Sequence, residues 1–457
     1  MERSLHFIGI GGIGMSAIAK IMLHNGFAVS GSDVKETRLT RDLALDGAEI
    51  SYGHRGENIP AAAEAVVYSS AIKPDNVEMR EALARGLKIY KRAEMLAYLM
   101  STKDGIGVAG AHGKTTTSAM IATMLEAGGQ DPTVVIGGML PALGNSNAKA
   151  GSGPCLVAEA DESDGTFLLL LPKIAVITNI EADHLDYYRD FDHIVAAFEQ
   201  YLRQLPPEGF AVVGSDCRAV REMMERIPAR YISYGLHTPG DYYAERLSHE
   251  PGGVAADICY RGEKLGRLTL HVPGEHNIVN ALAAIAIGRE LGLSFDQCAA
   301  GLARFTGTGR RYELLGRRGR MLIIDDYAHH PTEIKATIAA ARQQGMENIL
   351  AVFQPHRYSR TQTMYGDFAA ALFDADRVLI CGLYPAFEQP IPGVSARLIV
   401  DALETLGHQR VDYAPDLDQA LTFLRREITD EDMLLIMGAG NVRSLGETYA
   451  REEGDAL

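Results

Sequence analysis

Short apolar runs rich in Val and Ile alternate with longer segments of helical periodicity along almost the whole chain. The predicted strands are Leu5–Ile10, Ala28–Ser30, Ala65–Tyr68, Gly105–Ala109, Cys155–Ala158, Ile174–Thr178, Met321–Ile324, Ile349–Phe353, Val378–Ile380 and Met433–Met437. Strands separated by helices pair in parallel, because each helix carries the chain back across the sheet. The alternation therefore predicts an α/β fold with mostly parallel sheets.

One segment departs from this alternation. Between Arg230 and Val272, short alternating runs such as Gly253–Tyr260 and Arg267–Val272 are separated by Gly and Pro. Such runs are typical of antiparallel hairpins. We expect a small antiparallel β insertion here.

The chain is long enough for several domains. Its 457 residues correspond to about three domains of roughly 150 residues each. A polar stretch precedes a new strand at Ser101–Gly105, and two glycines interrupt the helical pattern at Thr306–Arg311. We expect domains over residues 1–103, 104–308 and 309–457, with Ser101–Gly105 and Thr306–Gly309 as candidate hinges.

Charge and cysteine usage narrow the classes of function. Asp and Glu number 59 against 44 Lys and Arg, a formal net charge of −15, which argues against broad binding to nucleic acid or anionic lipid. The five cysteines include no C-x-x-C pair, so they fit neither a disulfide framework nor a thiolate zinc site. The most apolar stretch, Phe167–Leu171, is far shorter than the roughly 20 residues that cross a bilayer. We expect a cytoplasmic protein without a secretory leader and without membrane insertion.

The first glycine-rich turn, G-I-G-G-I-G at residues 9–14, follows a predicted strand and opens a helix over Ser16–His24. Its glycines let backbone N–H groups approach a diphosphate, and the helix N-terminus adds a favourable dipole. Asp33 follows the second strand, where an acidic residue meets a ribose hydroxyl. Taken alone, this pattern favours a dinucleotide such as NAD or FAD, the alternative being glycines kept for packing. Ser69 and Ser70 follow another strand and either donate to the same phosphates or cap the next turn.

The second glycine-rich turn, G-A-H-G-K-T-T-T at residues 110–117, lies between a predicted strand and a helix over Ser118–Glu126. Amides in such a turn bind triphosphate oxygens, Lys114 neutralises charge, and Thr115 can ligate Mg²⁺. The turn is shorter than an ordinary Walker motif, because Val108 stands where the first glycine is usual. A chance G-K-T at a helix start is the weaker alternative.

Acidic residues follow two further strands directly. E-A-D-E-S-D occupies residues 159–164 and N-I-E-A-D-H-L-D occupies residues 179–186. Ligands bind at the carboxyl ends of parallel strands, so we expect these acids and His184 at the same edge as Lys114. Mg²⁺ prefers carboxylate and phosphate oxygens, with imidazole a less usual ligand. For each acid singly, a surface loop or a helix cap is the simpler interpretation, and only their convergence indicates a metal site.

The ordered motifs resemble those of the Mur ligases. They are G-A-H-G-K-T-T-T, E-A-D-E-S-D, N-I-E-A-D-H-L-D, P-G-E-H-N-I-V-N-A-L-A-A, G-T-G-R-R-Y-E, D-D-Y-A-H-H-P-T-E and F-Q-P-H-R-Y-S-R-T, and the resemblance spans residues 5 to about 445. It implies three α/β domains: an N-terminal Rossmann-like domain for a UDP-sugar, a central P-loop ATPase-type domain, and a C-terminal Rossmann-like domain for an amino acid. Together with G-I-G-G-I-G-M near the N-terminus, it indicates the alanine-adding branch. A UDP diphosphate then takes the place of NAD at the first glycine-rich turn.

The resemblance also implies a reaction. ATP activates the lactyl carboxylate of UDP-N-acetylmuramate as an acyl phosphate, and L-alanine displaces the phosphate, giving UDP-N-acetylmuramoyl-L-alanine for peptidoglycan precursor synthesis. ATP and Mg²⁺ are the implied cofactors, and we expect a monomer or a homodimer. Three alternatives remain open: a recycling ligase that adds a preformed tripeptide, a regulatory protein that kept the fold, and a nicotinamide dehydrogenase. F-Q-P-H-R-Y-S-R-T favours free alanine over the tripeptide.

Site residues are carried over from the same resemblance. The implied contacts to the UDP-sugar are Gly11, Gly12, Ile13, Gly14, Asp33, His54, Ser69 and Ser70. The implied contacts to ATP are Gly110, His112, Gly113, Lys114, Thr115, Thr116, His276, Asn277, Asn280, Arg311 and Asp326. The implied metal ligands are Thr115 and Glu159 for one Mg²⁺ and His184 for a second, with Glu162 as the alternative acid. Asn280 lies in an alanine-rich helix, where a buried amide held by backbone is the alternative. The Glu181–Arg203 helix region contains no lysine that could be carbamylated as in other Mur ligases, which agrees with the alanine-adding branch.

The amino-acid end is assigned to residues that follow the first two C-terminal-domain strands. A planar guanidinium suits an α-carboxylate, so Arg357 is the first choice, with Arg360 helping and His329 positioning the amine. An exposed cation at a helix start is the alternative for Arg360, and packing before Pro331 is the alternative for His330. The expected catalytic residues are Lys114, His184, His329 and Arg357.

Overall fold

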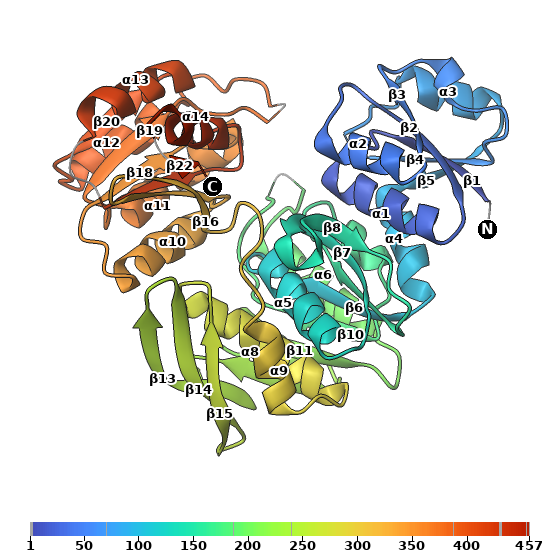
Figure 1. Ribbon diagram of the computed structural model, residues 1–457, viewed down its shortest axis with the longest axis horizontal. Helices are drawn as coiled ribbons and strands as arrows, with labels where there is room; N and C mark the ends of the chain where they lie inside the picture. The colour runs from blue at the N-terminus through green and yellow to red at the C-terminus, as the bar shows by residue number, and fades with distance from the viewer. Residues whose placement is uncertain are drawn as a thin grey trace. The chain divides into compact units, whose positions relative to one another are not determined.

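Three sheets organise the chain in the computed structural model, and helices pack beside each of them (Figure 1). The structure describes residues 3–69, 71–185, 187–238, 240–386, 388–428, 432–453 and 455–456. No helix of these residues is long and apolar enough to cross a membrane. The three-domain α/β architecture expected from the sequence is confirmed.

The N-terminal sheet has five parallel strands in the order β3-β2-β1-β4-β5. Its strands are β1 (Ser4–Ile8), β2 (Ala28–Asp33), β3 (Glu49–Tyr52), β4 (Ala65–Tyr68) and β5 (Lys88–Lys91). Its helices are α1 (Ile13–His24), α2 (Arg38–Leu45), η1 (Gly56–Asn58, a 3₁₀ turn), α3 (Val77–Ala84) and α4 (Arg92–Ser101). The strand order reverses beside β1, and such a switch point opens a crevice at the carboxyl ends of the strands. The first glycine-rich turn follows β1 and therefore lies at this crevice.

The central sheet has ten strands in the order β15-β14-β13-β12-β11-β10-β6-β9-β7-β8. Its strands are β6 (Asp104–Ala109), β7 (Thr133–Leu140), β8 (Ser146–Lys149), β9 (Cys155–Glu159), β10 (Ile174–Ile177), β11 (Phe210–Gly214), β12 (Tyr231–Gly235), β13 (Tyr242–Glu250), β14 (Gly253–Tyr260) and β15 (Glu263–Leu270). Its helices are α5 (Lys114–Ala127), η2 (Pro141–Leu143), η3 (Thr166–Leu169), α6 (Phe191–Arg203), α7 (Arg218–Arg226), α8 (Glu275–Glu290) and α9 (Phe295–Leu302). Neighbouring strands in the run β12-β11-β10-β6-β9-β7 pair in parallel. The edge strand β8 pairs antiparallel with β7.

The insertion predicted at residues 230–272 is antiparallel only in part. Two-residue connections join β13 to β14 and β14 to β15, and connections this short permit only antiparallel pairing. However, β12 pairs in parallel with both β11 and β13. The segment therefore starts as an extension of the parallel sheet, and the hairpins begin at Tyr242.

The C-terminal sheet has seven strands in the order β20-β19-β18-β21-β17-β16-β22. Its strands are β16 (Glu313–Arg318), β17 (Met321–Asp326), β18 (Ile349–Phe353), β19 (Arg377–Cys381), β20 (Val411–Ala414), β21 (Met433–Met437) and β22 (Asp455–Ala456). Its helices are α10 (Pro331–Gln343), α11 (Tyr358–Leu372), α12 (Arg397–Thr405), α13 (Leu417–Glu427) and α14 (Arg443–Glu453). Neighbouring strands in the run β20-β19-β18-β21-β17 pair in parallel. Strand β16 runs antiparallel to both of its neighbours, β17 and β22.

Several boundaries differ from the sequence-based expectation. Strand β1 ends two residues early, because the chain turns at Gly9, whose φ is +78°. Helix α5 begins at Lys114 instead of Ser118, because the glycine-rich turn itself starts the helix. The Glu181–Arg203 region is helical only from Phe191, where the Asp190 side chain caps α6 by accepting a hydrogen bond from the N–H of His193.

Candidate active site

The turn between β6 and α5 has the shape of a phosphate-binding loop. Gly110 and Gly113 have φ values of +133° and +83°, and a Cβ at Gly110 would lie 2.1 Å from Thr178 Oγ1. The N–H groups of Ala111 and His112 donate to Asn179, at 3.1 Å and 2.9 Å. The first N–H groups of α5 have no partner within the helix, an arrangement that binds phosphate oxygens. The triphosphate site expected at residues 110–117 stays a prediction, and Thr116 lies in the first turn of α5.

Lys114 is held in this turn by a carboxylate. Its Nζ lies 2.9 Å from both oxygens of Glu162 and donates to the carbonyl of Gly110 at 2.6 Å. Burial by itself lowers the pKa of Lys114, but the negative charges of Glu162, Asp161 and Glu159 outweigh it and raise the pKa above its ordinary value. The lysine is therefore fully protonated, which is the form that neutralises phosphate.

Thr115 and Glu159 bring two oxygen donors together beside the same turn. Thr115 Oγ1 donates to Glu159 Oε2 at 3.2 Å, and the N–H of Gly137 donates to Glu159 Oε1 at 2.5 Å. A hydroxyl and a carboxylate are the hard ligands that Mg²⁺ prefers. The geometry favours Glu159 over Glu162 as a ligand, because Glu162 is paired with Lys114.

His184 lies in the loop after β10 with a positive φ of +55°. Its N–H donates to Asp183 Oδ1 at 2.7 Å, and its Nε2 lies 3.6 Å from Asp183 Oδ2. Burial raises the pKa of Asp161, but the charge of Lys114, hydrogen bonds from Ser163 and the charge of His184 together lower it below its ordinary value. His184 is therefore close enough to Asp161 for its charge to lower the pKa of that acid.

The three residues of helix α8 that were expected near adenine differ in burial and in their hydrogen bonds. Asn280 is buried and accepts a hydrogen bond from Thr117 Oγ1 at 3.1 Å, so it lies directly behind the phosphate-binding turn. The Asn277 amide is also buried and donates to the carbonyl of Pro273 at 2.7 Å. His276 is exposed at the start of α8.

In the N-terminal domain, Asp33 is bound to the first glycine-rich turn. One of its carboxylate oxygens accepts from the N–H of Gly11 at 2.8 Å, and the other accepts from the N–H of Val34 at 2.7 Å. Gly12 caps α1 without a side chain, and Ile13 and Gly14 form the first turn of that helix. The Ser69 hydroxyl accepts from the N–H of Ala71 at 3.2 Å, which is the turn-capping alternative. Ser70 lies outside the described residues.

His54 belongs to a buried polar network. Its Nδ1 lies 3.1 Å from Ser32 Oγ and 3.5 Å from Glu78 Oε2. The His54 side chain retains 20% of its accessible surface, whereas Glu78 has none. His54 is therefore fixed on one side and open on the other.

A cationic cluster lies at the carboxyl ends of β17 and β18 in the C-terminal domain. The His329 ring centroid is 6.1 Å from that of His356, and the His356 ring stacks on Tyr384 at 5.6 Å. The pKa of His356 is lowered to about 3, first by burial and then by the positive charges of His329, Arg360, Arg357 and Arg310. Four basic groups thus lie close enough to His356 to keep its imidazole neutral. Two of them also have acidic neighbours, because Arg310 lies 3.4 Å from Asp325 and His329 lies 3.2 Å from Glu333.

The two arginines expected at the amino-acid end differ in burial. Arg357 precedes α11 with a φ of +72°, and its N–H donates to the carbonyl of Tyr384 at 2.8 Å. Arg360 lies in the first turn of α11 and is only 8% exposed. The interpretation of Arg360 as an exposed cation is therefore wrong, because the side chain packs inward against the domain. His330 is buried and caps α10, as the packing alternative expected.

Asp326 and Arg311 are neighbours in the same domain. The Asp326 carboxylate accepts from the N–H groups of Tyr312 at 2.9 Å and Ala328 at 2.8 Å. Burial raises the pKa of Asp326 to about 6, against the opposing charge of Arg311. Arg311 also lies over the ring of Tyr327, 5.4 Å from its centroid.

Sequence reasoning missed two residues of these clusters. His356 stands inside the F-Q-P-H-R motif beside Arg357, and this adjacency was a usable signal. Glu78 lies in the first turn of α3 and contacts Ser32, which is 46 positions away. No local pattern distinguishes such a residue from an ordinary helix-capping acid.

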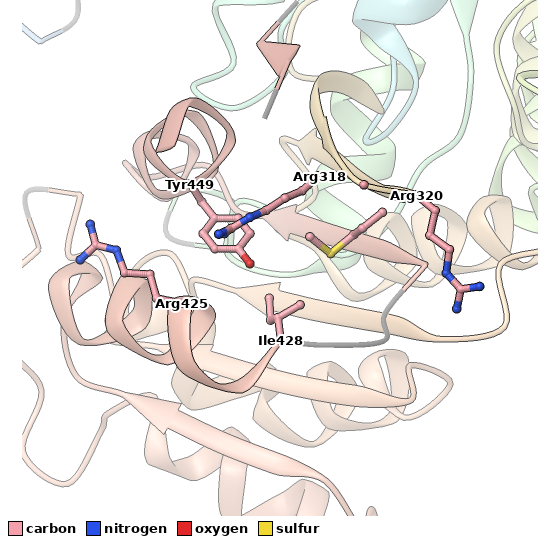
Figure 2. Close-up of a pocket in the computed structure, with 7 residues that line it drawn as sticks. Arg318, Arg320, Arg425, Ile428 and Tyr449 are labelled. Carbon is pink, nitrogen blue, oxygen red and sulfur yellow. The ribbon is translucent and has the colours of Figure 1, made fainter. Parts of the chain in front are cut away.

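A separate cavity of about 330 Å³ lies in the C-terminal domain, and Figure 2 shows its side chains. Its lining includes Arg318, Arg320, Arg425 and Tyr449. Arg425 pairs with Glu452, Arg320 lies 3.6 Å from Asp432, and Arg318 covers the ring of Tyr449 at 4.2 Å. The arginines already have partners from their own domain, so we assign this cavity no ligand.

Comparison with known proteins covers nearly the whole chain. Three descriptions of one family match in order: "Mur ligase family, catalytic domain" at residues 4–104, "Mur ligase middle domain" at residues 108–288, and "Mur ligase, glutamate ligase domain" at residues 310–440. The chain belongs to the Mur ligase family.

Similar Mur ligases are known in full length. The UDP-N-acetylmuramate–L-alanine ligase of Syntrophotalea carbinolica is 46% identical over 98% of this chain and 97% of its own. The ligase of the same name from Carboxydothermus hydrogenoformans is 47% identical over 97% of this chain and 95% of its own. The crystal structure of a UDP-N-acetylmuramate–alanine ligase from Thermotoga maritima superimposes with a TM-score of 0.83 at 30% identity, covering 98% of each chain.

Proposed function

We propose that this Mur ligase joins L-alanine to the lactyl carboxylate of UDP-N-acetylmuramate and converts ATP to ADP and phosphate. The observation that carries the proposal is the identity of 46% over 98% of the chain to a curated ligase with that substrate and amino acid in its name. The geometry supports it with three clusters: the turn beside Asp33, the turn beside Lys114 and the cationic cluster at Arg357. The match of all three parts of the chain to Mur ligase descriptions also speaks against a nicotinamide dehydrogenase.

The chemistry requires activation because an ionised carboxylate is a poor electrophile towards an amine. A lactyl carboxylate oxygen attacks the γ-phosphorus, the bond to the β–γ bridging oxygen breaks, and an acyl phosphate and ADP result. The neutral amine of L-alanine then attacks the carbonyl carbon, and the tetrahedral intermediate expels phosphate while the nitrogen loses a proton. Each step brings anions together, so electrostatic stabilisation is the main task of the protein.

The residues of the central domain suit that task. Lys114 neutralises the transferred phosphoryl group, and the amides at the start of α5 hold the phosphate oxygens. Thr115 and Glu159 are oxygen donors 3.2 Å apart and would hold Mg²⁺, with His184 near a second ion. When bound, Mg²⁺ offsets phosphate charge and polarises the carboxyl oxygen. His112, Asn280 and Gly113 shape the turn, while His276, Asn277, Arg311 and Asp326 are proposed contacts to the nucleoside and the phosphates.

The C-terminal cluster is proposed to receive L-alanine. The forked guanidinium of Arg357 binds the α-carboxylate and the buried Arg360 supports it, since a planar donor pair matches a carboxylate. His329 accepts a hydrogen bond from the incoming amine. His356 completes the pocket as a neutral imidazole.

The organisation of the molecule follows from these assignments. We place the UDP-sugar domain at residues 1–103, the ATP-binding domain at residues 104–308 and the amino-acid domain at residues 309–457, with Ser101–Gly105 and Thr306–Gly309 as hinges for closure. We also propose that the enzyme acts in the cytoplasm as a monomer or a homodimer.

A coupled ADP-release assay tests the function. Purified protein receives ATP, Mg²⁺ and UDP-N-acetylmuramate together with L-alanine, glycine, L-serine or a preformed tripeptide. We expect ADP release that needs all three substrates and is fastest with L-alanine. Turnover with the tripeptide but not with L-alanine would assign the chain to the recycling reaction, and no turnover with any of them would leave a regulatory protein.

A further inference from the structure

We propose that Glu78 is a positioning residue that, through Ser32, fixes the His54 imidazole in one tautomer and so makes it a hydrogen-bond acceptor for the uridine of the UDP-sugar. The inference rests on the proposed function, which places the UDP end at this domain. It extends that function to a residue outside the glycine-rich turn.

Glu78 is a fully buried carboxylate surrounded by donors. Ser32 Oγ donates to its Oε2 at 2.5 Å, and Asn58 Nδ2 and the N–H of Arg55 donate to its Oε1 at 2.6 Å and 3.1 Å. His6 Nε2 lies 3.5 Å from Oε2. Burial alone raises the pKa of Glu78, but these hydrogen bonds outweigh it and lower the pKa to about 2. The carboxylate is therefore ionised and can only accept hydrogen bonds.

The ionised carboxylate decides where the protons of its neighbours lie. A serine hydroxyl carries one proton, and Ser32 gives it to Glu78. Towards His54, 3.1 Å away, Ser32 Oγ can then only accept. The Nδ1 atom of His54 must carry a proton in that bond, so when the ring holds a single proton its Nε2 atom has a free lone pair. The structure gives Nε2 no partner among the described residues, and the side chain is 20% exposed.

Glu78 also connects the two loops that form the crevice beside β1. The carbonyl of Ser32 accepts from the N–H groups of Gly9 and Ile10 at 2.8 Å and 3.0 Å, so it anchors the first glycine-rich turn. Through Asn58 and the N–H of Arg55, Glu78 anchors the loop that carries His54. One buried charge thus sets the relative position of the diphosphate-binding turn and of the exposed imidazole edge.

An acceptor at this position selects a ligand by its donor. Uridine offers the imide N3–H of the base and the two ribose hydroxyls, whereas cytidine has an acceptor at N3. With Glu78 replaced by Gln, the amide can donate to Ser32, which can then donate to His54 Nδ1. The tautomer reverses, and Nε2 becomes a donor that repels N3–H.

Two measurements on the full-length protein test the relay. In protein labelled with ¹⁵N-histidine, with His54→Asn used to assign the signal, the ¹⁵N shifts of His54 should report the Nδ1–H tautomer. They should report Nε2–H in Glu78→Gln but remain unchanged in Glu81→Gln, a matched change in the same helix. If Glu78→Gln does not fold, the wild-type shifts alone still test the proposal, because a wild-type His54 with its proton on Nε2 overturns it. A correctly folded Glu78→Gln protein with an unchanged tautomer also overturns the proposal, whether or not the protein proves to be a ligase.

Binding of free nucleotides identifies the donor. UMP, CMP, 2′-deoxy-UMP and 3′-deoxy-UMP are titrated into wild-type and Glu78→Gln protein. If N3–H is the donor, wild type should bind UMP at least tenfold more tightly than CMP, and Glu78→Gln should lose that preference. If a ribose hydroxyl is the donor, one deoxynucleotide should lose the affinity instead. Equal affinity of wild type and Glu78→Gln for UMP would overturn the proposal, while a missing ligase activity with these preferences intact would count against the proposed function only.

Discussion

Replacing Glu162 with Gln should destabilise the nucleotide-free enzyme and strengthen its hold on nucleotide. Both oxygens of Glu162 lie 2.9 Å from Lys114 Nζ. At an effective dielectric constant of about 20, charges this close attract by roughly 6 kcal/mol. Asp161 and Glu159 keep part of this attraction in the variant, and Gln retains a hydrogen-bond acceptor. We therefore expect a loss of about 2 kcal/mol in the free energy of unfolding.

Nucleotide should reverse this loss because its phosphates supply the missing negative charge. By linkage, a gain of about 2 kcal/mol in the bound state corresponds to roughly 30-fold tighter nucleotide binding by the variant than by wild type. Calorimetric melting with and without a non-hydrolysable ATP analogue measures both effects, at roughly 2–4 °C per kcal/mol. Titration of the analogue measures affinity directly.

Asp164→Asn is the matched control, because Asp164 lies in the same segment and accepts its hydrogen bonds from Thr166. It should leave nucleotide affinity unchanged. A Glu162→Gln variant whose melting deficit is the same with and without the analogue would refute the reasoning. Weaker binding by this variant only when Mg²⁺ is present would instead make Glu162 a metal ligand.

Three further predictions concern other parts of the site. Gly113→Ala should lower the free energy of unfolding by about 1–3 kcal/mol and raise the KM for ATP at least tenfold. The reason is that the new Cβ would lie 2.8 Å from Asn280 Oδ1 at a φ of +83°. The control is Gly129→Ala, which has similar backbone strain but open space around the Cβ, and it should leave the KM for ATP unaltered. Because the pKa of Asp326 is raised to about 6, the folded state keeps a proton that the unfolded chain releases near pH 4. The free energy of unfolding of wild type should therefore fall by about 2–3 kcal/mol as the pH is raised from 4 to 6. Urea titrations should show this loss in wild type but not in Asp326→Asn, and equal pH slopes would contradict the assignment. Arg360→Lys keeps the charge but loses the planar pair of donors. Initial-rate measurements should therefore show a KM for L-alanine that is at least tenfold higher, while the KM for ATP stays within twofold. An unchanged KM for L-alanine would show that Arg360 does not contribute to the alanine pocket.

Much of the fold can be predicted because buried parallel strands are continuous apolar runs. All five residues of β18 and of β21 are buried, and both strands are visible in the sequence. Strands β7 and β11 were missed although they are mostly or wholly buried. The edge strands β3 and β5 were missed because each is four residues long with its end residues exposed and its central pair only half-buried. A short half-exposed run does not differ in pattern from a loop.

In the candidate site, too, local features could be predicted from the sequence, whereas contacts between distant segments could not. Both glycine-rich turns can be predicted because their residues are neighbours in the chain. Contacts such as that of Glu78 with Ser32, or the burial of Arg360, depend on how distant segments pack and have no local signature. Convergence of the strand ends was predictable from topology, but the pairing of Lys114 with Glu162 required side-chain positions.

Transfer of oxygen from the sugar acid to phosphate is the most direct test of the central claim that ATP activates the carboxylate. UDP-N-acetylmuramate labelled with oxygen-18 in its lactyl carboxylate is incubated with the enzyme, ATP, Mg²⁺ and L-alanine, and the phosphate released is analysed by mass spectrometry. The account predicts that each phosphate carries one oxygen from the carboxylate, and that Lys114→Met abolishes its release. Amide product formed together with unlabelled phosphate would contradict it.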